Sequence, residues 1–216
     1  MPLRLISHIE LPAHRSNGGF DHADIHLPTD RLYVAHTSND SIDVIDCARD
    51  QYIESIPGLM AVAGALVSET RDLVFTSNRG ENTVSVFAPC DERNAFKIAV
   101  GVKPNGLAFD PSRGLLIAAN VGDPSIPDSY SVSVVDLGRR ERIAEVKVPG
   151  RTPWAIYDAA REMFFVNIAS PARIWLLRLM TRPKYRPSTR FRPQGPTGWI
   201  SVQPRVGYCA PAMLAY

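Results

Sequence analysis

Polar and apolar residues alternate along most of the first 177 positions, and the alternation recurs in units of similar length. Each unit has an apolar stretch, a polar turn, a second apolar stretch, and then a segment such as residues 131–136 in which polar and β-branched residues alternate. A period of two with β-branched residues predicts half-buried strands, and no segment has a convincing helical period. We therefore expect each unit to contain four short strands.

Four segments align without gaps and define the repeat: residues 24–36, 65–77, 107–119 and 155–167. Their first residues lie 41, 42 and 48 positions apart, and a Pro-rich insertion around residues 122–128 accounts for the longest spacing. A repeat of about 42 residues with four strands is typical of a β-propeller blade. The sequence thus predicts an all-β fold with blades near residues 8–57, 58–101, 102–150 and 151–177.

The second strand of each unit carries a family resemblance. The segments Tyr33-Val-Ala-His36, Val74-Phe-Thr-Ser77, Leu116-Ile-Ala-Ala119-Asn120 and Phe164-Phe-Val-Asn167 resemble variants of a Tyr-Val-Thr-Asn repeat. The opening Gly19-Phe-Asp-His22 is also similar to the first blade of bacterial YVTN-repeat propellers. This resemblance implies about seven blades, so that we expect an incomplete propeller, and it implies a non-catalytic binding or interaction scaffold.

The composition changes after Glu162. Residues 163–216 hold eight Lys or Arg and no acidic residue, and residues 178–216 contain six Pro and six Arg without a blade pattern. We expect residues 178–216 to be a basic tail that is either disordered or read in a shifted frame, because another frame of its codons permits a fifth blade. Four blades of seven leave two apolar faces uncovered, which predicts self-association or a truncated fragment without a function of its own.

The residues just before the first strand of each blade are the candidate ligand site. In propellers this strand lines the central channel, and polar groups on loops of a rigid scaffold are suited to binding. The alternative is that these positions only form tight turns and pack the channel. The expected channel-mouth residues are His22, Ala63, Asn105 and Trp154.

Two metal sites come into question. His22, Asp24 and His26 would share one face of a strand, but about 13 Å separates the two histidines at roughly 3.3 Å per residue, which favours a structural role. Residues 102–111 resemble a segment of gluconolactonase-like propellers, in which the residue matching Asn105 binds a divalent metal. That resemblance implies the alternative function, a Ca- or Zn-dependent lactonase acting on a sugar lactone. The chain lacks the early Glu-Gly-Pro motif of that family and has no acidic residue after Glu162.

Other signals are absent from the sequence. It has no GxSxG elbow, Walker loop, dinucleotide fingerprint or HExxH motif, so we predict no cofactor outside the lactonase alternative. It has no membrane-length apolar run and no signal peptide, so the chain as written is expected in the cytoplasm, with the periplasm open for its relatives. The expected partner is an unknown small molecule or protein at the propeller face. Nucleic-acid binding by the tail arginines is not favoured, because a shifted frame would make them accidental.

Overall fold

The computed structural model describes residues 3–178 of the 216-residue chain. Its strands form four antiparallel sheets, and within each sheet successive strands pair. Blade 1 contains β1 (Phe20–His26), β2 (Arg31–His36), β3 (Ser41–Asp46) and β4 (Gln51–Ile56). Blade 2 contains β5 (Val62–Ser68), β6 (Leu73–Asn78), β7 (Thr83–Phe87) and β8 (Phe96–Ala99). Blade 3 contains β9 (Pro104–Asp110), β10 (Leu115–Asn120), β11 (Ser131–Asp136) and β12 (Glu141–Lys147). Blade 4 has three strands in the described residues, β13 (Ala155–Asp158), β14 (Met163–Ile168) and β15 (Arg173–Leu177).

The only helices in the described part of the chain are single 3₁₀ turns: η1 (Leu27–Thr29), η2 (Thr37–Asn39), η3 (Glu69–Arg71) and η4 (Glu92–Asn94). Among these residues no helix is long and apolar enough to cross a membrane. The cytoplasmic location stays a prediction, and the predicted tail lies outside the described residues apart from Arg178.

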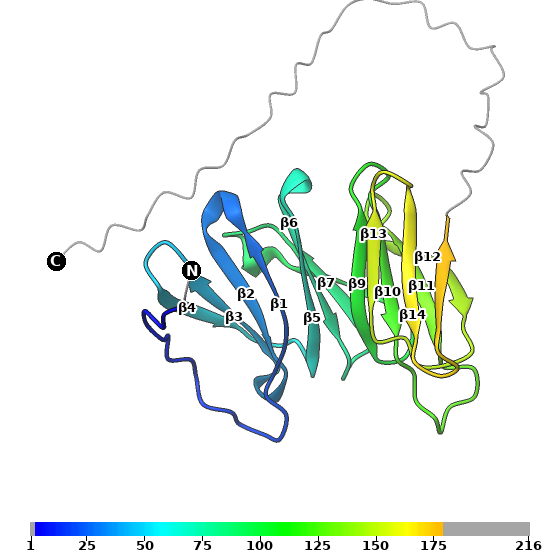
Figure 1. Cartoon of the computed structure of the whole chain (residues 1–216), viewed down its shortest axis with the longest axis horizontal. Helices are drawn as coiled ribbons and strands as arrows, with labels where there is room; N and C mark the ends of the chain where they lie inside the picture. Colours follow the sequence, from blue (N-terminus) through cyan, green and yellow to red (C-terminus); the bar gives the residue numbers. More distant parts are fainter. Residues whose placement is uncertain (1–2, 179–216) are drawn as a thin grey trace, which may run out of the picture. The chain divides into compact units, whose positions relative to one another are not determined.

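The sheets stand side by side like propeller blades (Figure 1). The first strand of each blade packs beside the first strand of the next, so that β1, β5, β9 and β13 follow one another. Within residues 3–178 the arc stays open, because no further sheet covers the far side of blade 4. The predicted all-β fold, an incomplete propeller, is therefore confirmed.

The sheet register corrects the repeat spacing at the first blade. The last paired residues of the four first strands are His26, Ser68, Asp110 and Asp158, so the blades are offset by 42, 42 and 48 residues. The gapless sequence alignment predicted 41 for the first offset and was wrong by one residue. The strand β2 begins with Arg31 where β6 and β10 begin with Leu73 and Leu115, so matching the first leucine of each strand shifts blade 1 by one residue.

Apolar side chains between neighbouring blades form the core. The rings of Tyr33 and Phe87 meet between blades 1 and 2 with centroids 5.9 Å apart, and those of Phe75 and Phe109 meet between blades 2 and 3 at 4.8 Å. All four side chains are buried. Burial of one such side chain contributes about 1.5–3 kcal/mol, so blade stacking is a main source of stability.

Hydroxyl groups join each pair of blades at the inner strands. One hydroxyl at each junction donates to a backbone carbonyl of the neighbouring blade: Thr37 Oγ1 to Val62 (2.6 Å), Ser77 Oγ to Asn105 (2.7 Å) and Thr152 Oγ1 to Asn120 (2.8 Å). These bonds satisfy buried polar groups and fix the distance between inner strands.

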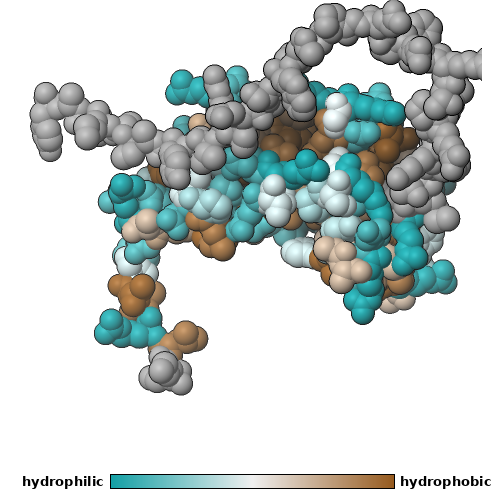
Figure 2. Space-filling view, turned by 90° about the horizontal axis from the view of Figure 1, so that it is seen from above, coloured by the Kyte–Doolittle hydropathy of each residue, from teal (hydrophilic) through white to brown (hydrophobic). Residues whose placement is uncertain are grey.

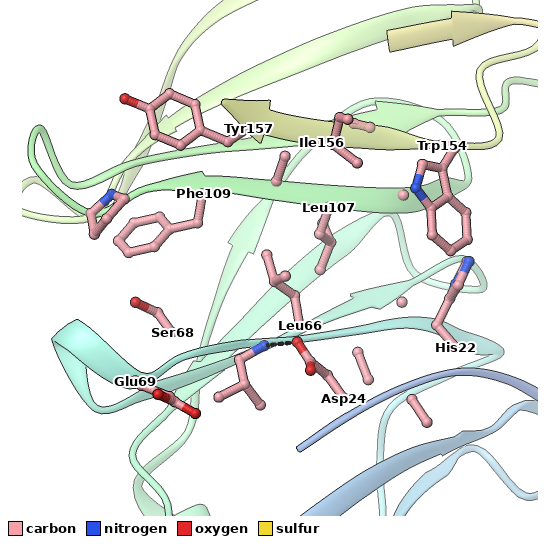
Figure 3. A pocket seen from close by; sticks show the side chains of 18 of the residues that line it. His22, Asp24, Leu66, Ser68, Glu69, Leu107, Phe109, Trp154, Ile156 and Tyr157 are labelled. Carbon is pink, nitrogen blue, oxygen red and sulfur yellow. Dashed lines mark hydrogen bonds between the residues drawn. The ribbon is translucent and has the colours of Figure 1, made fainter. Parts of the chain in front are cut away.

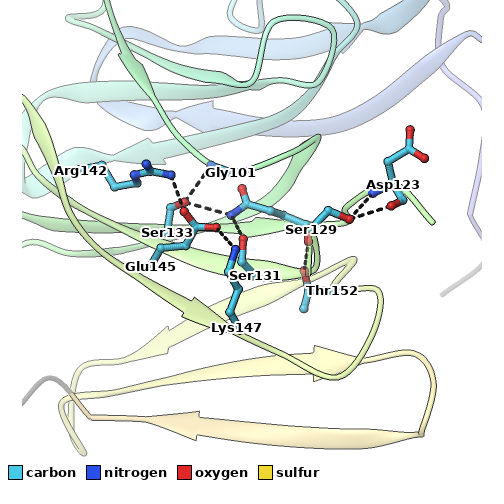
Figure 4. Close-up of polar contacts among 10 residues, drawn as sticks. Gly101, Asp123, Ser129, Ser131, Ser133, Arg142, Glu145, Lys147 and Thr152 are labelled. Carbon is cyan, nitrogen blue, oxygen red and sulfur yellow. Dashed lines mark hydrogen bonds and ion pairs between the residues drawn. The ribbon is translucent and has the colours of Figure 1, made fainter. Parts of the chain in front are cut away.

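A buried amide organises the polar interior of blades 2 and 3. In blade 3, Asn120 Nδ2 donates to Ser131 Oγ at 2.9 Å and Ser133 Oγ at 3.0 Å, and the latter accepts the Gly101 N–H (Figure 4). In blade 2, Asn78 Nδ2 donates in the same way to Thr83 Oγ1 and Ser85 Oγ. The blade 2 network is uncharged, whereas in blade 3 the Glu145 carboxylate is also hydrogen-bonded to Ser131.

Blade 1 replaces this network by charged groups. His36 pairs with Ser41 across β2 and β3, as Asn78 pairs with Thr83 and Asn120 with Ser131. Its Nδ1–H donates to Asp43 Oδ2 at 2.7 Å, and neither side chain is exposed.

The outer blades at the two ends of the arc, blade 1 and blade 4, differ in what packs against them. The N-terminal segment lies on blade 1 through a contact of 2.8 Å between His14 Nδ1 and His36 Nε2, although its first residues project away from the sheets (Figure 2). On blade 4, Ile156, Ile174 and Leu176 are 54%, 65% and 57% exposed. Within the described residues blade 4 therefore presents a bare apolar face.

Candidate functional site

The inner strands β1, β5, β9 and β13 line an elongated cavity, which we call the central trough. Its volume is about 580 Å³, within the range of about 300–1,000 Å³ usual for small-molecule sites. Figure 3 shows its lining side chains, with Leu66, Leu107 and Ile156 in the middle, His22 and Trp154 at one end, and Glu69 and Tyr157 at the other.

The four residues predicted to form the channel mouth lie close together, but only His22 and Trp154 line the trough, and Ala63 and Asn105 are buried. The prediction placed them just before the first strands, whereas only Trp154 precedes its strand and the other three lie inside β1, β5 and β9. His22 Nδ1 donates to Ala63 O at 2.9 Å, and the His22 ring meets the edge of the Trp154 ring with centroids 4.4 Å apart. Asn105 Nδ2 donates to the carbonyl of Pro153, next to Trp154, at 2.6 Å. The structure thus brings all four residues together, and a ligand role for them stays a prediction.

The contacts of His22 assign its ring proton. Nδ1 faces two acceptors, Ala63 O at 2.9 Å and Asp21 Oδ1 at 3.1 Å, so it carries the hydrogen. In the neutral ring Nε2 is then an acceptor, and it has no hydrogen-bond partner among residues 3–178. His22 can accept a hydrogen bond from a ligand.

Arg79 links the blades at the mouth and was missed in the sequence analysis. It follows the last residue of β6, and its Nη2 donates to Asp21 Oδ2 of blade 1 at 2.8 Å and to Asn105 Oδ1 of blade 3. Because Asn105 in turn donates to Pro153 O, contacts run from blade 1 to the segment that leads into blade 4. The only sequence signal for Arg79 was its place directly after a strand of the repeat.

The four inner strands differ at one equivalent position of the mouth. The corrected register aligns His22, Gly64, Gly106 and Trp154. A Cβ on Gly64 would lie 2.6 Å from Asn105 O, and one on Gly106 would lie 2.7 Å from Trp154 Cα. The backbone of the following blade therefore excludes side chains in blades 2 and 3, whereas blades 1 and 4 place rings at the mouth.

The trough is lined mainly by apolar side chains and also contains two acidic side chains. Asp24 accepts the backbone N–H groups of Ile25 and Val67 at 2.9 and 2.7 Å, and the Glu69 carboxylate has no partner among the described residues. No Lys or Arg lines the trough. Arg71 lies near its end but directs Nε to Pro111 O at 2.6 Å.

Tyr157 lines the acidic end of the trough, and its hydroxyl is hydrogen-bonded to the Asp110 carboxylate, which does not line the trough. Burial, followed by the nearby charge of the Asp110 carboxylate, raises the pKa of the Tyr157 phenol above its usual range. The phenol therefore stays protonated at neutral pH.

The three alternating polar residues of β1 have separate partners. His22 contacts Ala63, Asp24 binds backbone N–H groups, and His26 Nδ1 lies 2.8 Å from Thr29 Oγ1. Among residues 3–178 no group of three or more His, Cys, Asp or Glu could hold a metal ion. These contacts fit the structural role expected for the trio.

The lactonase alternative requires Asn105 as a metal ligand. Its amide oxygen accepts the Arg79 guanidinium, so a divalent ion at this oxygen would have to displace a positively charged partner. The metal and the lactonase activity stay predictions, and no observation in the described residues favours them.

Comparisons with known proteins agree with the propeller fold. No family model and no curated protein sequence matches the chain. Among solved structures, Kuenenia stuttgartiensis hydrazine synthase is similar with a TM-score of 0.65 and 14% identity, over 74% of this chain and 46% of that one. The β-propeller domain of Myceliophteria thermophila Cps50 (Swd1) has a TM-score of 0.60 and 11% identity, over 74% and 54% of the two chains. The dihydro-heme d1 dehydrogenase NirN, in complex with DHE, has a TM-score of 0.56 and 17% identity, over 79% and 35%.

These similarities define a class and no particular activity. The chain has a β-propeller fold and spans about half the length, or less, of the three structures that it matches. At these identities the likeness concerns the fold alone, because propellers carry many unrelated functions.

Proposed function

We propose that this chain is a non-catalytic binding scaffold of the YVTN-repeat kind, and that its ligand is a small molecule bound in the central trough. The supporting observation is an apolar cavity of about 580 Å³ with His22 and Trp154 at one end. The buried residues Ala63 and Asn105 contact this end through His22 and Pro153 but do not line the cavity. A largely apolar cleft with a few converging polar groups is the usual form of a small-molecule site.

The arrangement of the polar groups supports binding rather than catalysis. In the trough the hydroxyl of Ser68 and the ring of His22 lie at opposite ends, so they cannot act as nucleophile and base (Figure 3). The His22 Nδ1–H is already used by Ala63 O, and Asp24 binds backbone groups. Nucleophilic catalysis requires nucleophile and base within hydrogen-bond reach.

The neutral fluorophore N-phenyl-1-naphthylamine tests the proposal. We expect saturable binding with one site per full-length chain and increased fluorescence. Ile156→Ser should weaken binding about tenfold, because it removes apolar contact from the trough. Ile143→Ser is the matched control: Ile143 is 43% exposed on β12 and does not line the trough. Non-saturable binding, or equal effects of the two substitutions, would disprove a ligand site in the trough.

A further inference from the structure

The charges in the central trough have one sign. Asp24 and Glu69 are its ionisable acids, and none of the lining residues is Lys or Arg. The side chain of Asp24 is used by two backbone N–H groups, whereas Glu69 has no side-chain partner among the described residues. A carboxylate without a counter-charge beside an apolar cavity attracts a cation and repels an anion.

Two arginines beside the trough make their contacts elsewhere. Arg71 belongs to the same 3₁₀ turn as Glu69 but donates to the carbonyls of Pro111 and Ser112 at 2.6 and 3.5 Å. Arg79, at the other end, is paired with Asp21 at 2.8 Å. Neither guanidinium contacts Glu69, so its charge remains available to a ligand.

Aromatic rings accompany the acids. Phe109 and Tyr157 lie at the Glu69 end of the trough, and Trp154 and His22 lie at the mouth (Figure 3). The faces of aromatic rings attract cations, and this attraction adds to that of a carboxylate. The middle of the trough, between Leu66, Leu107 and Ile156, provides apolar contact only.

We infer that the trough selects a monocationic aryl- or alkylammonium compound, with its apolar body between β5, β9 and β13 and its ammonium group toward Glu69. This inference rests on the proposed function, and it adds the chemical class of the ligand. The volume of about 580 Å³ accommodates a molecule with one aromatic ring and a short chain.

Three probes of the same carbon skeleton test the inference: 4-phenylbutylammonium, neutral 4-phenylbutan-1-ol and anionic 4-phenylbutanoate. Each displaces N-phenyl-1-naphthylamine from the full-length chain at pH 7 and low salt. We expect affinity to fall from cation to alcohol to anion. Glu69→Gln should weaken the cation about threefold, the scale of an exposed ion pair, and leave the alcohol unchanged.

The control is Glu54→Gln, which changes the net charge equally at an exposed residue of β4 outside the trough. It should leave the order and the affinities as in the unsubstituted protein. Equal affinities for the three probes, or equal effects of the two substitutions, overturn the ammonium inference while fluorophore binding still supports the trough. Failure of the fluorophore itself to bind overturns the proposed function, and the inference with it.

Discussion

Blade 1 and the two middle blades carry different polar side chains at the same buried position of the repeat. In blades 2 and 3 a buried asparagine, Asn78 or Asn120, donates to hydroxyl groups of the next strand. In blade 1 the equivalent position is His36, which donates to the buried carboxylate of Asp43. Asn78 has hydrogen-bond partners for both its amide nitrogen and its amide oxygen, whereas Asn120 Oδ1 has none among the described residues. A buried carboxylate demands donors of its own.

Both donors to Asp43, His36 and Ser55, belong to blade 1, and the N-terminal segment contacts the other ring nitrogen of His36. Asp43 Oδ1 accepts the Ser55 hydroxyl at 2.6 Å, and His36 Nε2 lies 2.8 Å from His14 Nδ1. The middle blades have blades on both sides, whereas blade 1 has the N-terminal segment on one side. The carboxylate of blade 1 is therefore bound by residues of its own blade, and the segment outside the repeat contacts only its partner His36.

The largest expected effect comes from removing the carboxylate in blade 1. Asp43→Ala leaves the His36 and Ser55 donors without their acceptor in a site with no solvent exposure. Breaking such a buried pair should lower the free energy of unfolding by about 3 kcal/mol. Urea unfolding of the full-length chain, followed by tryptophan fluorescence, measures the loss.

Two further variants distinguish the loss of the buried Asp43 carboxylate from the loss of an ordinary hydrogen bond. Ser85→Ala, at the equivalent position of blade 2, removes one neutral hydrogen bond and should cost only about 1 kcal/mol. The double variant His36→Asn with Asp43→Ser copies the middle blades and should recover most of the loss. If the two single variants lose equal stability, the distinction between charged and neutral blades is wrong.

A second, smaller loss of stability is expected where the inner strands β9 and β13 pack together. A Cβ in Gly106→Ala would lie 2.7 Å from Trp154 Cα and 2.8 Å from Ala155 N, and backbone atoms cannot rotate away. We expect a loss of about 1–3 kcal/mol in urea unfolding, together with weaker fluorophore binding, because β9 and β13 must separate. Gly138→Ala is the control, since only Asp136 Oδ1 at 3.3 Å is near its Cβ. An unchanged Gly106→Ala protein would show that the inner strands are not closely packed there.

The repeat and the mouth residues could be read from the sequence, because each depends on local patterning. His22, Ala63, Asn105 and Trp154 were predicted from the repeat, and they do lie close together, although three of them lie inside the first strands and only His22 and Trp154 line the trough. Arg79 could not be found, because its pairing with Asp21 and Asn105 depends on how three blades are placed in space. The one-residue error in blade 1 has a local cause, because Arg31 begins β2 where the next two blades have a leucine.

The smallest expected effect lies in two turns with the same Asp–Arg contact, one after β3 in blade 1 and one after β13 in blade 4. Asp46 and Asp158 each accept the backbone N–H of the arginine three residues later, at 3.0 Å, and pair with its guanidinium. The side-chain hydrogen bond from that arginine, Arg49 or Arg161, is the main cause that lowers the pKa of each carboxyl group. A lowered pKa in the folded state stabilises the protein above the unfolded pKa of about 3.9, and this contribution is lost as the pH falls further.

Asp46→Asn combined with Asp158→Asn should therefore reduce the dependence of stability on pH below about 5, with little change in the shape of the curve near pH 7. Urea midpoints measured from pH 3 to 7 compare the double variant with the unsubstituted chain. Asp50→Asn is a matched control, because no ion pair of Asp50 occurs among the described residues. If the stability of the double variant falls equally steeply as the pH is lowered, these turn contacts do not differ in strength between the folded and unfolded states.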